Sequence, residues 1–107
     1  MKLMKKSTTL LPLRFNDGTE VPADIFQRIL ERFWINFGGV TIEGEVDGHW
    51  IDTQDQQHYE DRSKKVVVIV PDDQLDAARE LVREARVELG QIVMYFEVAD
   101  VDFEYLD

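Results

Sequence analysis

The stretch Val66-Val67-Val68-Ile69-Val70 decides the fold of this chain. All five side chains are apolar and β-branched, which favours an extended strand. A strand with one exposed face alternates apolar and polar residues, whereas a run that is apolar on both faces is typical of a strand covered on both sides. Residues 66–70 are therefore predicted to form a strand in the middle of a β-sheet.

Patterned segments lie on both sides of this strand in a definite order. An apolar run at 10–15 leads into a helical periodicity at 22–37, and an alternating segment at 40–51 precedes the central strand. A second helical pattern at 74–89 and an alternating run at 92–98 follow it. This β-α-β-β-α-β order predicts a ferredoxin-like fold of the α+β class, a two-layer sandwich in which an antiparallel four-stranded sheet carries two helices on one face.

Both predicted helices have recognisable ends. Pro22 suits the first turn of the first helix, and Gly38-Gly39 ends it with a left-handed C-cap. The second helix is predicted to begin after Pro71, with Asp72 or Asp73 as its N-cap.

The chain length of 107 residues suits one domain, residues 1–107, with one modest core. Residues 1–9 are predicted to be a flexible N-terminus. Residues 99–107 alternate acids with hydrophobes, and they either form an extra edge strand or dock on a second subunit. Pro12 is awkward in a central strand because it cannot donate a hydrogen bond. Residues 52–65 are predicted to be a long polar connection.

The charge balance limits the partners of the chain. Twenty-two acidic against twelve basic residues give a net charge of −10, and a nucleic-acid binder needs a basic footprint. The only basic cluster is Lys2, Lys5 and Lys6, so direct nucleic-acid binding is not predicted. The acidity indicates solubility, a partner with a basic surface, or mimicry of nucleic-acid charge.

Several kinds of chemistry are excluded by residue type. The absence of cysteine excludes disulfides, Fe–S clusters, thiolate zinc sites and thiol nucleophiles. No glycine-rich phosphate loop or nucleophile-elbow serine is present, so no cofactor and no catalytic residue are predicted. No apolar stretch approaches the roughly 20 residues that span a bilayer. No membrane partner is expected, and a cytoplasmic location is predicted.

Both histidines accompany carboxylates, in the stretches 49–52 and 58–61. Two imidazoles with nearby carboxylates could hold a divalent metal or act as an acid–base pair. Their spacing matches no metal motif, and a solvated loop accounts for them, so no metal site is predicted.

Three short motifs resemble a family of small uncharacterised bacterial ferredoxin-like proteins. They are Phe37–Thr41, Gly48–Asp52 and Tyr59–Lys64, which follow a Gly-Val-Thr, Gly-x-Trp and Glu-x-Ser progression similar to that of the family. The resemblance covers roughly residues 10–98 and implies the fold, with no activity attached to it. Pro12 and the acidic tail have no counterpart in the family pattern.

The same motifs indicate a candidate ligand site. If Trp50 faces the segment 60–64 across a hairpin, a shallow binding site forms between them. Its predicted residues are His49, Trp50, Asp52, Tyr59, Glu60 and Arg62.

A candidate interface comes from the apolar runs. In a sheet with helices on one face only, Val67, Ile69, Val93 and Tyr95 are predicted to form an apolar patch on the open face, and such patches bind partners. The first functional hypothesis is a non-enzymatic interaction module that forms a homodimer through this patch and engages a protein partner.

Two alternatives stay open. One is a small-molecule-sensing or small catalytic ferredoxin-like domain, with a cleft between the sheet and the first helix that is lined by Phe33, Phe37 and Trp50. The other is an acidic inhibitor that mimics nucleic acid.

Overall fold

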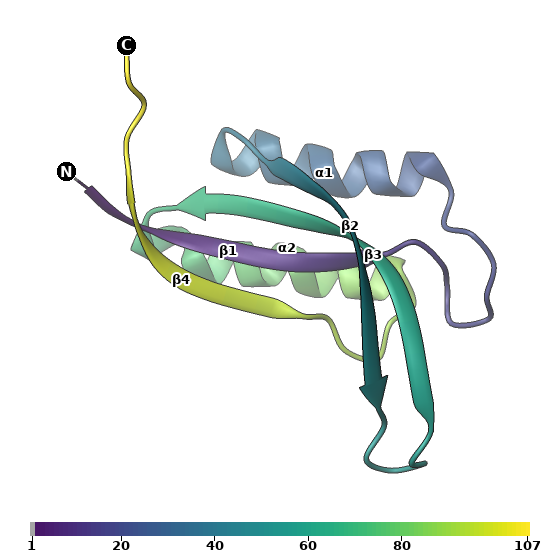
Figure 1. Ribbon diagram of the computed structural model, residues 1–107. Coiled ribbons are helices and arrows are strands. Elements are labelled where there is room, and N and C mark those ends of the chain that lie inside the picture. The colour runs from purple at the N-terminus through teal and green to yellow at the C-terminus, as the bar shows by residue number, and fades with distance from the viewer. Residues whose placement is uncertain (1) are drawn as a thin grey trace.

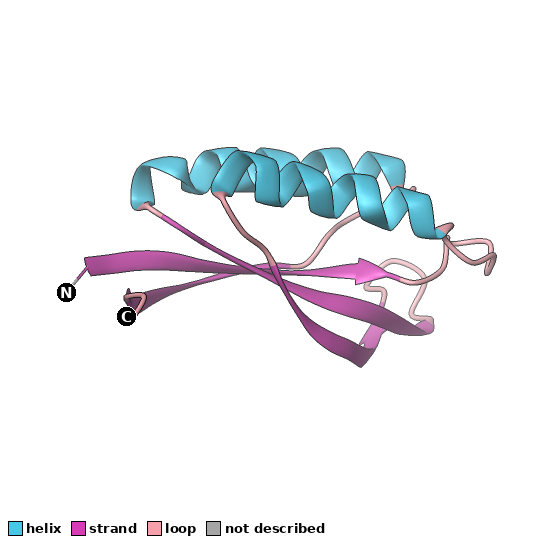
Figure 2. Cartoon of the chain, turned by 90° about the horizontal axis from the view of Figure 1, so that it is seen from above, coloured by secondary structure: helices cyan, strands magenta, loops and turns pink. Residues whose placement is uncertain are grey.

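The computed structural model describes residues 2–107, and its helices form one layer over a β-sheet (Figures 1 and 2). Both helices cover the same face of the sheet (Figure 2). This α+β architecture is consistent with the predicted ferredoxin-like fold. The elements in chain order are β1 (Lys2–Pro12), α1 (Ala23–Phe37), β2 (Thr41–Ile51), β3 (His58–Val70), the short 3-10 helix η1 (Asp72–Gln74), α2 (Leu75–Glu88) and β4 (Phe96–Phe103).

The sheet has four strands in the order β2-β3-β1-β4, and all neighbouring strands are antiparallel. Val66 of β3 pairs with Thr9 of β1 on one side and with Ile42 of β2 on the other. The prediction of a central strand is therefore confirmed at Val66 and Val67, whereas residues 68–70 pair with β1 alone.

The core lies between the helices and the sheet. On α1 the buried residues Phe26, Ile29, Leu30 and Phe33 recur at helical spacing, which gives one apolar face. They pack in one cluster with residues of β1, β3 and α2. Burying each large side chain of this kind contributes about 1.5–3 kcal/mol to folding, so the helix face and the sheet face stabilise each other.

Helix α1 ends at the predicted C-cap, and Pro22 is its N-cap, one position before the first helical residue. The N-cap predicted for α2 is wrong, whereas its C-terminal end agrees with the predicted range. Gly38 has a φ of 80° and its N–H donates to the carbonyl of Trp34, so it is the left-handed C-cap of α1. Neither Asp72 nor Asp73 is the N-cap of α2, because these residues form η1 and the cap position falls on Gln74. No helix of the described residues is long and apolar enough to cross a membrane.

The first strand starts much earlier than the apolar run at 10–15 suggests. Residues 2–9 belong to β1, so the prediction of a flexible N-terminus over residues 1–9 is wrong for them, and Met1 lies outside the described residues. Pro12 is the last residue of the strand, where the missing N–H costs no ladder hydrogen bond.

Buried hydroxyl side chains explain why this polar segment forms a strand. Ser7 and Thr9 are both buried. The Ser7 hydroxyl donates to the carbonyl of Val68 at 3.1 Å, and the Thr9 hydroxyl donates to the carbonyl of Tyr95 at 2.8 Å. These buried polar groups therefore have partners, and the segment can lie inside the sheet at little cost.

The hairpin β2–β3 is also longer than predicted. Residues 58–65, expected in a polar connection, belong to β3, and only residues 52–57 connect the two strands. Because β1 ends opposite Ser63, residues 46–63 project beyond the rest of the sheet as a two-stranded arm (Figure 1). The strands lose their regular register between Ile42 and Glu45, where Gly44 has a φ of 93°, as in a β-bulge.

The last strand is shifted toward the C-terminus. β4 covers residues 96–103 rather than 92–98, and its pairing with β1 continues without a break from Phe96 to Phe103. Residues 99–103 therefore complete this edge strand and are not an additional one. Residues 104–107 carry no regular structure.

The apolar patch predicted on the open face is only partly exposed. Val67 is only 5% exposed, and it lies between its register partners Thr8 and Thr41 on the neighbouring strands. Val93 and Tyr95 precede β4 and lie outside the sheet. Ile69 is itself half-buried, so Val67 and Ile69 expose little apolar surface, and most of the exposed area belongs to Val93 and Tyr95. Self-association through this face stays a prediction.

Candidate functional site

The arm forms one wall of a groove of about 1180 Å³. The segments 12–21 and 91–95 contribute the other walls, and all three parts lie at the same end of the molecule (Figure 1). All six residues of the predicted ligand site line this groove: His49, Trp50, Asp52, Tyr59, Glu60 and Arg62. They do not share one face of the arm, because Trp50 pairs with Tyr59 on one face, whereas His49 pairs with Glu60 on the other. Ligand binding by these residues stays a prediction.

The alternative cleft beside α1 is not found in this form. Phe33 is buried in the core, and Phe37 packs against the core cluster. Of the three predicted cleft residues only Trp50 lines the groove.

An aromatic pair gives the arm a flat surface. Trp50 and Tyr59 are register partners on the two strands, and their rings stack with centroids 4.7 Å apart and an interplanar angle of 22°. The indole N–H of Trp50 donates to the carboxylate of Asp61 at 2.8 Å. Both aromatic side chains remain partly exposed to solvent, so the arm presents a positioned aromatic platform to the groove.

Asp55, in the connection between the strands, holds the other end of the platform. The Tyr59 hydroxyl donates to the Asp55 carboxylate at 2.6 Å. This hydrogen bond lowers the pKa of Asp55 below its ordinary value and raises the pKa of Tyr59. Asp52 has a local role, because its carboxylate accepts the backbone N–H of Gln54 at 2.7 Å.

The two histidines lie against each other on the arm. Nδ1 of His49 and Nε2 of His58 are 3.0 Å apart, and the rings stack at 5.1 Å with an angle of 14°. Among the described residues no group of three or more potential metal-ligating side chains occurs, so the pair is better described as one hydrogen-bonded unit.

The groove is predominantly negative. Five carboxylates line it against two arginines. Arg62 is already paired, since its Nε donates to Glu45 at 2.9 Å, a contact that raises the pKa of Arg62. Such a field attracts cationic ligands and repels phosphates. The five carboxylates belong to Glu20, Asp47, Asp52, Glu60 and Asp61.

Some groove residues were not anticipated from the sequence. Asp61 belongs to the motif at 59–64, and its contact with Trp50 depends on a strand pairing that was expected to be a loop. The segment 91–95 reaches the groove because it precedes β4 instead of forming part of it. The contact of Asp61 and the position of the segment 91–95 were both missed because the predicted boundaries of β3 and β4 were wrong.

The comparisons with known proteins concern the fold. No protein family model and no curated protein sequence matches the chain. Among solved structures, the chain is similar to a phage SAM lyase in complex with S-methyl-5′-thioadenosine, with a TM-score of 0.69 and 12% sequence identity. The similarity covers 97% of this chain and 93% of that chain. At this identity it shows a shared fold.

Proposed function

We propose that this chain is a ferredoxin-like domain that binds an adenosine sulfonium or thioether, of the class of S-adenosylmethionine (SAM) and S-methyl-5′-thioadenosine, in the groove beside the arm. The observation that carries this proposal is the stacked Trp50–Tyr59 pair in a predominantly acidic groove. The fold is similar to that of a protein solved with S-methyl-5′-thioadenosine, which supports this class of ligand.

The aromatic platform suits the adenine ring. A purine offers a flat π-face, and stacking of one base on an aromatic side chain contributes about 1–3 kcal/mol. Asp61 holds the indole of Trp50 in place. A ring fixed before binding loses less conformational entropy when the ligand arrives.

The groove charge favours the sulfonium over other adenosine compounds. SAM carries a positive sulfur and an ammonium group, whereas AMP carries a phosphate that the carboxylates of the groove repel. A cation next to an aromatic face is further stabilised by about 0.5–2 kcal/mol. The expected order of affinity is SAM, then neutral S-methyl-5′-thioadenosine, then AMP.

Cleavage of SAM is the reaction that the structural neighbour suggests. When the bond between sulfur and the four-carbon amino acid breaks, its electron pair stays on sulfur and the positive charge disappears. The departing fragment balances this by losing a proton or by bonding to its own carboxylate. The neutral thioether product is no longer attracted by the carboxylates of the groove, which favours its release.

Calorimetric titration of the chain with SAM, S-methyl-5′-thioadenosine and AMP tests the binding. We expect Trp50→Ala to weaken SAM binding at least about tenfold, because it removes the stacking surface. Ile51→Ala is the matched control, since Ile51 is an exposed neighbour on β2 outside the groove lining. It should change the affinity less than about twofold.

Chromatography of SAM incubated with the chain tests the reaction by the appearance of S-methyl-5′-thioadenosine. If SAM binds but no S-methyl-5′-thioadenosine is formed, the chain is a sensor of SAM and lyase activity is excluded. Absence of binding of both ligands at millimolar concentration would contradict the proposal.

A further inference from the structure

A second groove, of about 490 Å³, lies between α2 and the segment that leads into β4. Three arginines at helical spacing form one wall, which is unusual in a chain with a net charge of −10. Apolar side chains form the other. The residues that define this arginine groove are Arg79, Arg83, Arg86, Ile92, Val93 and Met94.

The arginines can accept a new anionic partner. Arg79 pairs with Asp76 at 2.7 Å and Arg83 pairs with Glu80, each within one turn of α2. Ion pairs between exposed side chains contribute about 0–1 kcal/mol. Little stability is therefore lost when an arginine gives up its own carboxylate and pairs with one of a binding partner. Arg86 uses one N–H for the carbonyl of Gln91 at 3.1 Å and keeps others for a ligand.

The apolar wall defines the kind of anion. Ile92 and Val93 are 78% and 70% exposed beside the arginines. A small inorganic anion would leave these side chains uncovered. A peptide segment that alternates carboxylates with large hydrophobes would satisfy both walls at once.

The C-terminal residues of the chain are such a segment. Residues 102–107 read Asp-Phe-Glu-Tyr-Leu-Asp, and Tyr105 and Leu106 are 89% and 83% exposed. We infer that residues 102–107 of one copy bind in the arginine groove of a second copy, with carboxylates on the arginines and hydrophobes against Ile92 and Val93. This inference does not depend on the proposed ligand.

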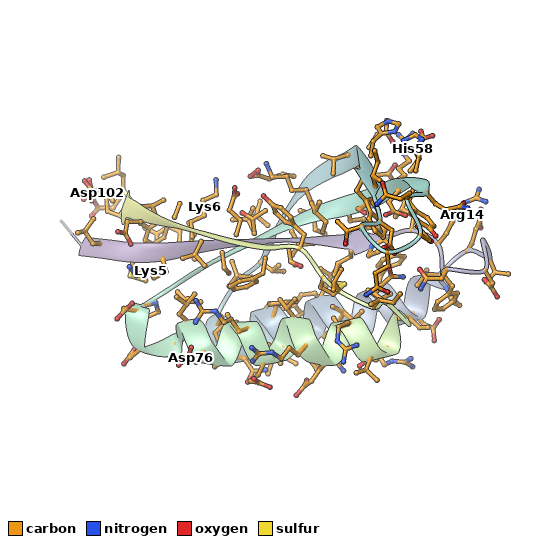
Figure 3. The ribbon with its side chains drawn as sticks, turned by 90° about the horizontal axis from the view of Figure 1, so that it is seen from below. Lys5, Lys6, Arg14, His58, Asp76 and Asp102 are labelled. Atoms are coloured by element: carbon orange, nitrogen blue, oxygen red, sulfur yellow. The ribbon has the colours of Figure 1, made fainter. Side chains whose placement is uncertain are left out.

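The segment cannot reach the groove of its own chain. From Phe96, beside the groove, β4 runs away for about 23 Å to Phe103. Residues 104–107 extend at most about 14 Å. Figure 3 shows Asp102, near the end of β4, at one end of the molecule, with Arg14 and His58 at the other. The contact therefore joins different copies head to tail, which produces a closed ring or an open chain.

Sedimentation velocity of the full chain over a range of concentrations tests this inference. We expect reversible association that Arg83→Glu and Glu104→Lys each weaken at least about tenfold, because each variant places like charges together. Both side chains are exposed, and circular dichroism checks that the variants fold. An equimolar mixture of the two variants should associate again, because the groove of the Arg83→Glu variant meets the tail of the Glu104→Lys variant, which has the opposite charge. The unchanged groove and the unchanged tail form the original contact.

Arg28→Glu is the matched control, since Arg28 lies on α1 in a similar exposed pair with Asp24. It should leave association unchanged. A wild-type chain that stays monomeric at 100 micromolar would overturn the inference, because a dissociation constant of that size already corresponds to a weak binding free energy of about 5.5 kcal/mol. Association that Arg83→Glu does not weaken would overturn it as well.

Discussion

The arm and the body of the sheet are made stable in different ways. In the body, Val66, Val68 and Val70 of β3 lie beneath the helices and are almost fully buried. In the arm, residues 58–62 of the same strand are all exposed, and cross-strand side-chain pairs replace the core. Such pairs contribute about 0.2–1 kcal/mol each. One strand thus provides both the rigid centre of the fold and a loosely held wall of the candidate site.

The largest effect expected from this difference concerns the body. Phe33 is 2% exposed in the core, so Phe33→Ala should lower the free energy of unfolding by about 3–5 kcal/mol. Urea denaturation measures this change. Ile35→Ala, on the exposed side of the same helix, should change it by less than about 0.5 kcal/mol. Equal effects of the two variants would contradict the placement of the core.

Hydrogen exchange compares the two parts within one strand. Amides of Val66 and Val67 should exchange only through global unfolding, because this part of β3 is buried and has strands on both sides. Amides of the paired arm residues should exchange at least about a hundredfold faster, through local opening. Mass spectrometry of peptides from the two parts measures the ratio. Uniform protection along β3 would show that the arm is as stable as the body.

The smallest effect concerns the Asp55–Tyr59 hydrogen bond. The folded-state pKa of Asp55 lies below its ordinary value of 3.8. The bond therefore stabilises the arm above that pH, and its contribution is lost as the pH falls through the folded-state pKa. Tyr59→Phe should raise the pKa of Asp55, but only part of the way, because the Gln57 N–H still donates to it at 2.8 Å.

Carboxyl NMR titration of Asp55 measures this shift, and Asp17 is a suitable internal control. Thr19 lowers the pKa of Asp17 through its own hydrogen bonds, far from the arm in sequence. Its titration should not respond to Tyr59→Phe. An unchanged titration of Asp55 would show that the hydrogen bond is absent in solution.

The order of elements could be predicted from the sequence because burial leaves periodic apolar patterns. Helix α1 and the central part of β3 follow from such patterns. The first half of β1 could not be predicted, since Ser7 and Thr9 are polar and become favourable only through partners far along the chain. The local sequence carries no sign of those partners.

The candidate site likewise contains residues that could be predicted from the sequence and residues that could not. The six residues that reach the groove were selected from two short motifs, because a hairpin brings them together. The β2 half of the arm lies within the predicted alternating segment 40–51. The β3 half was missed, since residues 58–62 are exposed and have no apolar alternation. The groove further needs the segments 12–21 and 91–95, whose positions depend on tertiary packing.

The position of Pro12 at the end of β1 leaves part of the edge of β3 without a neighbouring strand. Because β1 ends at Pro12, and Leu13 donates only to the carbonyl of Arg62, residues 58–61 have no strand beside them on that edge within the described chain. The main-chain amides and carbonyls that point to this edge, rather than to β2, are left free. In the proposed function they are available to a purine edge or a ribose hydroxyl. Hydrogen bonds from the main chain do not depend on which side chains are present, so they would be kept when the surrounding residues are substituted.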